Sequence, residues 1–108
     1  VDACPENYSL FDMLIRTDFS PYQFSWKLLD SINTLLYDGQ DYSDKNTEYH
    51  FRGCVAVSQN DCATLMLYDS YGDGGTYYDI TWNGTEIAKG TQGYQDLVFK
   101  MGSCDIDN

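Results

Sequence analysis

Short runs in which apolar and polar residues alternate dominate this 108-residue chain, and they restrict it to β-structure. An alternation of period two places every second side chain on one face, as in a strand that buries one side and exposes the other. Two runs show this period, 22–29 ("YQFSWKLL") and 76–82 ("TYYDITW"). Their apolar faces are predicted to hold Tyr22, Phe24, Trp26 and Leu28, and Tyr78, Ile80 and Trp82.

Two further segments need separate interpretation. The run 62–69 ("CATLMLYD") is apolar on both faces, which predicts a strand at the centre of a sheet. The segment 24–39 ("FSWKLLDSINTLLYDG") fits two strands, but its leucines and Ile32 also recur at helical spacing. We favour strands over a helix in this segment.

Turn residues separate the apolar runs. The pair Asn83-Gly84 is the clearest hairpin signal, because a type I′ turn requires positive φ at both central residues. Short strands punctuated in this way predict an all-β fold: a single antiparallel β-sandwich, jelly-roll or immunoglobulin-like, of about eight strands. With no internal repeat and no linker, residues 1–108 are predicted to form one domain.

The charge of the chain limits its partners. Seventeen acidic and six basic side chains give a net charge of −11, and the acids are spread along the whole chain. A phosphate backbone and an anionic membrane surface both repel such a protein, so no nucleic-acid partner is expected. Direct membrane insertion is not expected either, because no apolar run approaches the roughly 20 residues of a membrane span.

Four cysteines indicate two disulfides and therefore an oxidising compartment. No two cysteines form a C-x-x-C pair and His50 is the only histidine, so a zinc site is disfavoured. Of the three pairings, we expect Cys54 with Cys62, closing a hairpin, and Cys4 with Cys104, joining the termini.

Secretion is the expectation that follows. The chain starts at Val1 without a methionine or a signal peptide, which we interpret as a mature protein found outside the cell or at its surface. Two N-x-S/T sequons agree with this interpretation and predict glycosylation of Asn7 and Asn83 in a eukaryotic source.

The stretch 69–75 ("DSYGDGG") combines two carboxylates with three glycines. Such a sequence forms tight turns, because the Asp side chain accepts hydrogen bonds from nearby backbone N–H groups and Gly adopts positive φ without strain. It also suits calcium, which takes about six to eight oxygen ligands in loose geometry, here from Asp69, Asp73 and backbone carbonyls. An EF-hand is excluded, because that loop needs acids where Tyr71 and Ile80 stand.

The segment 62–90, with its Cys-led strand, acidic loop and Asn-Gly turn, resembles the "DSYGDG" module of secreted and cell-surface proteins of algae, other protists and some bacteria. The segment 14–30 ("LIRTDFSPYQFSWKLLD") is similar to the opening of that module, with Gln23 in place of an acid. The resemblance implies a secreted β-sandwich, often repeated in adhesive or cell-wall proteins, and no known reaction.

A calcium site follows as an expectation if the opening hairpin of this module lies beside the acidic loop. Asp18 would then supply a third carboxylate, and the carbonyl of Tyr71 or Gly75 would complete the shell. The predicted calcium ligands are therefore Asp18, Asp69, Tyr71, Asp73 and Gly75.

Catalysis is not expected from these residues. Any Ser-His-Asp arrangement depends on His50, which we interpret as a packed or surface residue of a strand, and no nucleophile-elbow motif accompanies it. A pair of acids suffices for a glycosidase, but 108 residues leave little room for a deep cleft.

Ten tyrosines are many for this length. Tyrosine supplies rigid contact area at low entropic cost, which suits sugar stacking and protein interfaces, although half of the tyrosines are equally expected to cap the sandwich. The candidates for an exposed surface are Tyr37, Tyr42, Tyr49, Tyr77 and Tyr94.

Two functions remain. The leading interpretation is a non-catalytic extracellular building block that assembles with copies of itself into a filament or surface layer, stabilised by calcium, with residues 1–10 as an exchanging arm. The alternative is a monomeric carbohydrate-binding or adhesive module that uses exposed tyrosines as a stacking platform.

Overall fold

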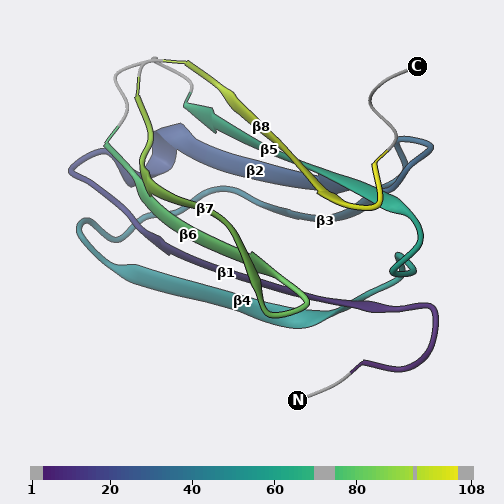
Figure 1. The fold of residues 1–108 in the computed structure, drawn as a ribbon. Coiled ribbons are helices and arrows are strands. Elements are labelled where there is room, and N and C mark those ends of the chain that lie inside the picture. The colour runs from purple at the N-terminus through teal and green to yellow at the C-terminus, as the bar shows by residue number, and fades with distance from the viewer. Residues whose placement is uncertain (1–3, 70–74, 94, 105–108) are drawn as a thin grey trace.

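The computed structural model describes residues 4–69, 75–93 and 95–104, which form two antiparallel sheets packed face to face (Figure 1). The strands are β1 (Ser9–Arg16), β2 (Phe24–Leu29), β3 (Leu35–Gly39), β4 (Glu48–Val55), β5 (Cys62–Asp69), β6 (Tyr77–Trp82), β7 (Thr85–Thr91) and β8 (Leu97–Gly102). A short 3-10 helix, η1 (Pro21–Gln23), precedes β2. The predicted antiparallel β-sandwich of eight strands is confirmed.

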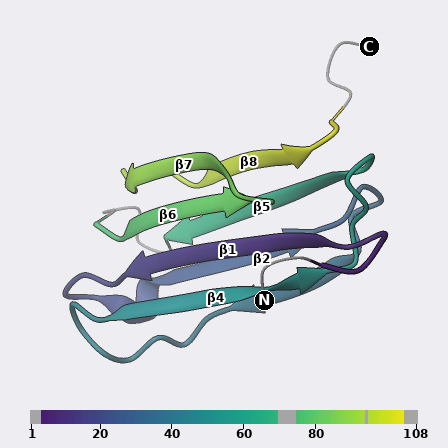
Figure 2. The same ribbon diagram turned by 60° about the horizontal axis from the view of Figure 1, so that its bottom comes forward.

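The strand order is β4-β1-β6-β7 in one sheet, sheet A, and β3-β2-β5-β8 in the other, sheet B. The two layers lie one above the other with their strands nearly aligned (Figure 2). β2 and β3 form a hairpin, so the prediction of strands over a helix in 24–39 is confirmed. β5 lies between β2 and β8, which confirms the predicted central strand.

The core lies between the sheets and is built from alternate positions of each strand. Phe24, Trp26 and Leu28 point inward as predicted, and so do Ile80 and Trp82. The fully enclosed core residues are Phe11, Met13, Ile15, Phe24, Trp26, Leu28, Val55, Val57, Ala63, Leu65, Leu67, Ile80, Trp82 and Met101.

The position of Tyr22 differs from the prediction. It belongs to η1 and is 64% exposed, so it does not share the inner face with Trp26. Pro21 favours the first position of a helical turn, and the extended backbone resumes only at Phe24.

The hairpin between β6 and β7 confirms the predicted type I′ turn. Asn83 and Gly84 have φ values of 50° and 83°, and Trp82 pairs directly with Thr85. The Oδ1 atom of Asn83 also accepts a hydrogen bond from the backbone N–H of Leu10 at 2.7 Å, which ties the hairpin to β1.

The disulfides join Cys4 to Cys54 and Cys62 to Cys104, so the expected pairing is wrong. The segment between Cys54 and Cys62 is not a hairpin, because it carries the chain from edge strand β4 of sheet A to central strand β5 of sheet B.

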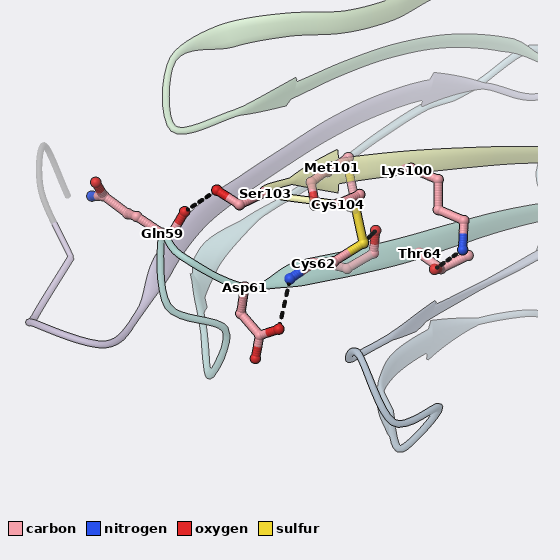
Figure 3. Close-up of a disulfide and its surroundings, with 9 residues drawn as sticks. Gln59, Asp61, Cys62, Thr64, Lys100, Met101, Ser103 and Cys104 are labelled. Carbon is pink, nitrogen blue, oxygen red and sulfur yellow. Dashed lines mark hydrogen bonds between the residues drawn. A yellow bond between two sulfur atoms is a disulfide. The ribbon is translucent and has the colours of Figure 1, made fainter. Parts of the chain in front are cut away.

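Strand register explains the observed pairs. Leu10 lies opposite Cys54, so the chain that precedes β1 runs beside the end of β4. Gly102 lies opposite Cys62, which places Cys104 at a Cα–Cα distance of 4.7 Å from Cys62 (Figure 3). Each disulfide therefore fastens segments that strand pairing has already brought together.

The two ends of the sandwich differ. The described ends of the chain, both disulfides and the hairpins β2–β3 and β6–β7 lie at one end, called the terminal end (Figure 1). The segments 17–23, 40–47, 75–76, 92–93 and 95–96 meet at the opposite end, called the loop end. Among the described residues, no helix has the length and apolar character needed to cross a membrane.

The N-terminal segment is part of the sandwich over its described length. Cys4 is covalently bonded to β4, and Ser9 and Leu10 belong to β1 in the middle of sheet A. The arm expected over residues 1–10 therefore does not extend freely from Cys4 onward.

Candidate functional site

The loop end brings together two of the predicted calcium ligands. A Cβ atom built on Gly75 would overlap Oδ2 of Asp18, so this carboxylate lies directly against the glycine. Oδ1 of Asp18 accepts a hydrogen bond from the backbone N–H of Ser20 at 2.8 Å, which fixes the carboxylate in an Asx turn. The 17–23 segment and Gly75 are thus neighbours, which is the condition under which the sequence analysis included Asp18 among the calcium ligands.

The other predicted ligands are only partly placed. Asp69 ends β5, and its backbone N–H donates to Oδ1 of Asp96 at 3.3 Å. Tyr71 and Asp73 lie outside the described residues. Within 4–69, 75–93 and 95–104, no three acidic, histidine or cysteine side chains gather closely enough to hold a metal ion.

Two buried polar side chains, Thr17 and Gln92, close the interior beneath the loop end. Thr17 is buried, and its hydroxyl donates to the carbonyl of Asp44 at 2.6 Å, which holds the 40–47 segment in place. Gln92 is 2% exposed, and its Nε2 donates to the carbonyls of Leu67 and Gln95 at 3.3 and 3.2 Å. These bonds anchor the loops to the ends of the strands.

An aromatic cleft opens where the edge strands β3 and β4 face each other. Its volume is about 250 Å³, and core residues reach its floor. The residues that line it are Met13, Ile15, Trp26, Asp38, Gly39, Tyr42, Tyr49, His50 and Phe51. Four of the nine lining residues, Trp26, Tyr42, Tyr49 and Phe51, carry large aromatic rings.

Three of the five predicted surface tyrosines gather at this cleft. The ring centroid of Tyr42 lies 4.7 Å from that of Tyr49, and the centroid of Tyr37 lies 5.0 Å from that of Phe51. Tyr42 and Tyr49 are half-buried against the core, which corrects their assignment to a freely exposed surface. This packing arises because β3 and the 40–47 segment lie opposite β4 at one edge of the sandwich, and strand alternation alone does not show it.

Tyr42 is held in the cleft wall by a hydrogen bond. The Nε1–H of Trp26 donates to the Tyr42 hydroxyl oxygen at 2.9 Å. Burial raises the pKa of Tyr42 above its ordinary value, and the bond from Trp26 offsets part of that rise. The phenol therefore stays neutral at physiological pH and keeps its own hydrogen as a donor.

The remaining tyrosines lie elsewhere. Tyr77 is on the outer face of sheet A, where the guanidinium of Arg16 sits 5.2 Å from its ring centroid. Tyr94 lies outside the described residues. Tyr78, predicted to point inward, packs against Phe99 with a centroid distance of 5.6 Å.

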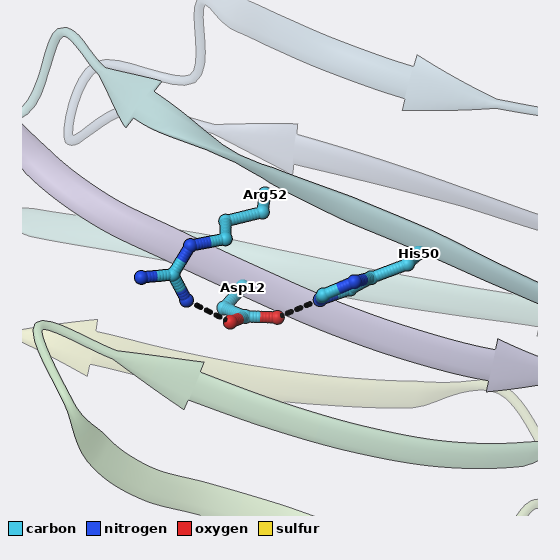
Figure 4. Close-up of polar contacts among 3 residues, drawn as sticks. All are labelled: Asp12, His50 and Arg52. Carbon is cyan, nitrogen blue, oxygen red and sulfur yellow. Dashed lines mark hydrogen bonds and ion pairs between the residues drawn. The ribbon is translucent and has the colours of Figure 1, made fainter. Parts of the chain in front are cut away.

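A charged cluster on the outer face of sheet A was missed by the sequence reading (Figure 4). The Nε2 atom of His50 and the Nη1 atom of Arg52 each lie 2.5 Å from one oxygen of Asp12. Burial alone would raise the pKa of Asp12, but the hydrogen bonds and positive charges of His50 and Arg52 outweigh it and lower this pKa. Side-chain alternation in β1 and β4 places Asp12, His50 and Arg52 on the outward face of each strand. Which of them become neighbours follows only from the register of the two strands.

The two sequons lie at the terminal end. Asn7 and Asn83 are both exposed, in the segment before β1 and in the β6–β7 turn. Ser9 of the first sequon is buried, and its hydroxyl donates to the carbonyl of Val57 at 2.7 Å. Glycosylation of either asparagine stays a prediction.

Comparison of the chain with protein-family models, curated protein sequences and solved structures finds no match. The functional inference accordingly rests on the surfaces of the molecule itself.

Proposed function

We propose that this chain is a non-catalytic extracellular structural module that assembles with copies of itself into a filament or surface layer. The observation that supports this best is the position of the large exposed apolar side chains. Phe19 and Tyr22 are 75% and 64% exposed at the loop end, and Leu35 and Val98 are 49% and 54% exposed on sheet B. Exposed apolar side chains at separate places on one module favour a head-to-tail contact, which produces an open polymer when its rotation does not close a ring.

The covalent framework agrees with an extracellular setting. Two disulfides, consistent with an oxidising compartment, fasten both described ends of the chain to the sandwich. The resemblance of segments 14–30 and 62–90 to secreted surface modules points in the same direction. A small rigid domain of this kind suits repetition in a polymer.

Electron microscopy of the native, non-reduced protein at millimolar calcium tests this function. Filaments or sheets with a repeating globular unit are the expected result, and light scattering should show growth with protein concentration. Isolated particles of one sandwich at every concentration would refute the proposal.

Calcium binding at the loop end is part of the same proposal. The contact between the Asp18 carboxylate and Gly75 supports it, because both residues belong to the set of calcium ligands expected from the sequence. A bound cation would also reduce the repulsion between copies that carry eleven net negative charges each. Calcium is expected to raise the melting temperature of the parent protein and to have a much smaller effect on Asp18→Asn; an equal rise in both proteins would exclude Asp18 as a ligand.

The aromatic cleft favours a second candidate function, a monomer that binds a carbohydrate. Half-buried tyrosine rings offer faces for a sugar ring, and the Tyr42 hydroxyl offers a hydrogen-bond donor. Retention of the monomer on immobilised polysaccharide, lost in Tyr49→Ala and kept in Tyr77→Ala, would support this function. A monomer that no polysaccharide retains would argue against it.

A further inference from the structure

We propose that the free edge of β4 pairs antiparallel with β4 of a second copy of this chain, about a two-fold axis that passes through His50. The contact joins two A sheets into one continuous sheet. It goes beyond the proposed function, because such a contact closes on itself and defines a dimer, whether or not the dimers then assemble into a polymer.

Among the edge strands of the two described sheets, β4 is the best suited to pair with another chain. It lies at the edge of sheet A (Figure 2), spans eight residues and keeps a regular register with β1 over that length. β3, β7 and β8 are shorter, β3 and β7 have register shifts with their partners, and β8 carries the exposed Lys100. Short length, bulges and lysines protect sheet edges from pairing, and β4 has none of these features.

Hydrogen bonds beside β4 show which of its backbone groups face the free edge. The N–H of Thr17 donates to the carbonyl of Thr47 at 3.0 Å, in the register that continues through β1 and β4. On the other side of β1, the N–H of Asn83 donates to the carbonyl of Leu10 at 2.8 Å. Because bonded positions recur at every second residue of an antiparallel pair, odd-numbered residues of β1 bond to odd-numbered residues of β4, and even-numbered residues of β1 bond to β6.

The backbone groups of Glu48, His50 and Arg52 are therefore directed away from β1, toward the free edge. Pairing about an axis at His50 sets the two His50 residues opposite each other as a hydrogen-bonded pair, in which each N–H donates to the other carbonyl. Glu48 of each copy then lies opposite Arg52 of the other, and these positions also direct their backbone groups at the partner strand.

Charge selects this register and identifies a second copy as the occupant. Only an axis at His50 sets Glu48 of each copy opposite Arg52 of the other. An axis at Glu48 or at Arg52 would set like charges opposite each other, which destabilises a sheet. The edge of β4 is thus complementary to itself both in the sign of its charges and in the direction of its backbone groups.

The intramolecular contacts of these side chains are compatible with the pairing. Arg52 is bonded to Asp12 (Figure 4), and Glu48 lies opposite Arg16 in β1. Across the joined sheet, Arg16 and Glu48 of one copy continue into a row with Arg52 and Asp12 of the second. Each charge in this row has neighbours of the opposite sign only, and the guanidinium of Arg52 has enough N–H donors for two carboxylates.

The aromatic cleft lies along the same edge and gives the contact an apolar part. Tyr49 and Phe51 line the cleft, and both pack against the core on the inner side of sheet A. With the axis at His50, Tyr49 of each copy lies opposite Phe51 of the other. Cross-strand aromatic pairs add stability to an antiparallel sheet, and the pairing removes part of both clefts from water.

Charge reversal at the edge tests the inference. Glu48→Lys sets two positive charges opposite each other in a dimer, and Arg52→Glu sets two negative charges opposite each other. The protein concentration at which half of the copies are associated, measured by sedimentation velocity, is expected to rise about tenfold or more in each variant. Thermal melting of each variant verifies that the sandwich is folded.

Two substitutions in β7, at the far edge of sheet A, separate this effect from a change in net charge. Glu86→Lys changes the net charge from −11 to −9, as Glu48→Lys does, and Lys89→Glu changes it to −13, as Arg52→Glu does. Both control variants are expected to associate at the same concentration as the parent.

A mixture and a cross-link test the register. In an equimolar mixture of Glu48→Lys and Arg52→Glu, each positive charge of one variant lies opposite a negative charge of the other, so dimers are expected to return. The Cα atoms of a hydrogen-bonded pair lie about 5.5 Å apart, within reach of a disulfide. His50→Cys is therefore expected to form a covalent dimer on mild oxidation, whereas Glu48→Cys is not, because its two thiols do not lie opposite each other.

The outcomes separate this inference from the proposed function. If the parent forms dimers that do not grow, the inference holds and the polymer does not. If the parent polymerises but Glu48→Lys and Arg52→Glu associate as it does, the β4 edge is not a contact and the proposed function stands. Equal loss in the β7 controls, a mixture that recovers no dimers, or equal cross-linking of both cysteine variants would each overturn the inference. A parent that stays monomeric at every concentration overturns both.

Discussion

Gly39 allows Trp26 and Tyr42 to meet at the open edge of the sandwich. A Cβ atom at position 39 would overlap the indole nitrogen of Trp26 and lie 2.6 Å from the Tyr42 hydroxyl oxygen. The hydrogen bond between these two side chains occupies the space that a larger residue would fill. The absence of a Cβ atom at position 39 therefore leaves the space in which the Trp26 and Tyr42 side chains meet.

Gly39→Ala is expected to lower the free energy of unfolding by about 1–3 kcal/mol, because the added methyl group forces the Trp26 and Tyr42 side chains apart. Urea unfolding followed by tryptophan fluorescence measures this change. Gly93→Ala is the control, because a Cβ atom there meets no atom within 4 Å. Equal stability of the two variants would contradict the packing described here.

Asp12 makes the stability of sheet A depend on pH. Its pKa is lowered from 3.8 in the folded protein, so its contribution is present above the unfolded pKa and is lost as the pH falls through the folded pKa. At pH 7, Asp12→Asn is expected to be less stable than the parent by about 1 kcal/mol, and this difference should vanish at strongly acidic pH.

An NMR titration of the Asp12 carboxyl group checks the same point directly. The midpoint is expected below 3.8 in the parent and closer to 3.8 in Arg52→Gln, which lacks one of the two donors. A parent midpoint at or above 3.8 would show that burial outweighs the bonds from His50 and Arg52.

At the scale of the elements, register decides which residues become neighbours. The antiparallel pairing of β5 with β8 places Cys104 beside Cys62, and the pairing of β1 with β4 places Asp12 opposite Arg52. These contacts join residues that are far apart in the chain, with separations of 42 for Cys62–Cys104 and 40 for Asp12–Arg52.

Removal of the Cys62–Cys104 disulfide measures how much this cross-link between β5 and the end of β8 contributes to the free energy of unfolding. With a separation of 42 residues, Cys62→Ser with Cys104→Ser is expected to cost about 4 kcal/mol, because the unfolded chain regains its loop entropy. Urea unfolding measures the loss. Peptide mapping of the non-reduced protein provides the covalent control, and recovery of a Cys54–Cys62 peptide would contradict the pairing.

At the scale of the whole molecule, the covalent cross-links lie at one end of the sandwich only. Both disulfides lie at the terminal end, whereas side-chain hydrogen bonds from Thr17 and Gln92 hold the described part of the loop end. The loops are therefore positioned by a sandwich that is cross-linked away from them.

Reduction of both disulfides is expected to unfold the protein at 37 °C. The two losses together amount to about 8 kcal/mol by the loop-entropy estimate, which is comparable with the whole stability of a typical domain. Circular dichroism with and without reductant measures this outcome. A cooperative transition well above 37 °C in the reduced protein would show that the core alone is sufficient.

The sequence by itself determined the class of the fold. Alternating runs, turn residues and the Asn83-Gly84 pair were enough to predict an antiparallel sandwich, its central strand and the position of one hairpin. These features were predictable because they depend on the period of side chains along a strand and on local backbone preferences.

Only the tertiary structure decided which distant residues meet. The disulfide pairs, the Asp12 cluster and the aromatic cleft all depend on strand order and register, which side-chain periodicity does not specify. Alternation predicts whether a side chain points inward or outward, but it does not predict which strand lies beside it. For that reason Tyr42 and Tyr49 were predicted at the surface, whereas the fold packs Tyr42 of the 40–47 segment against Tyr49 of β4.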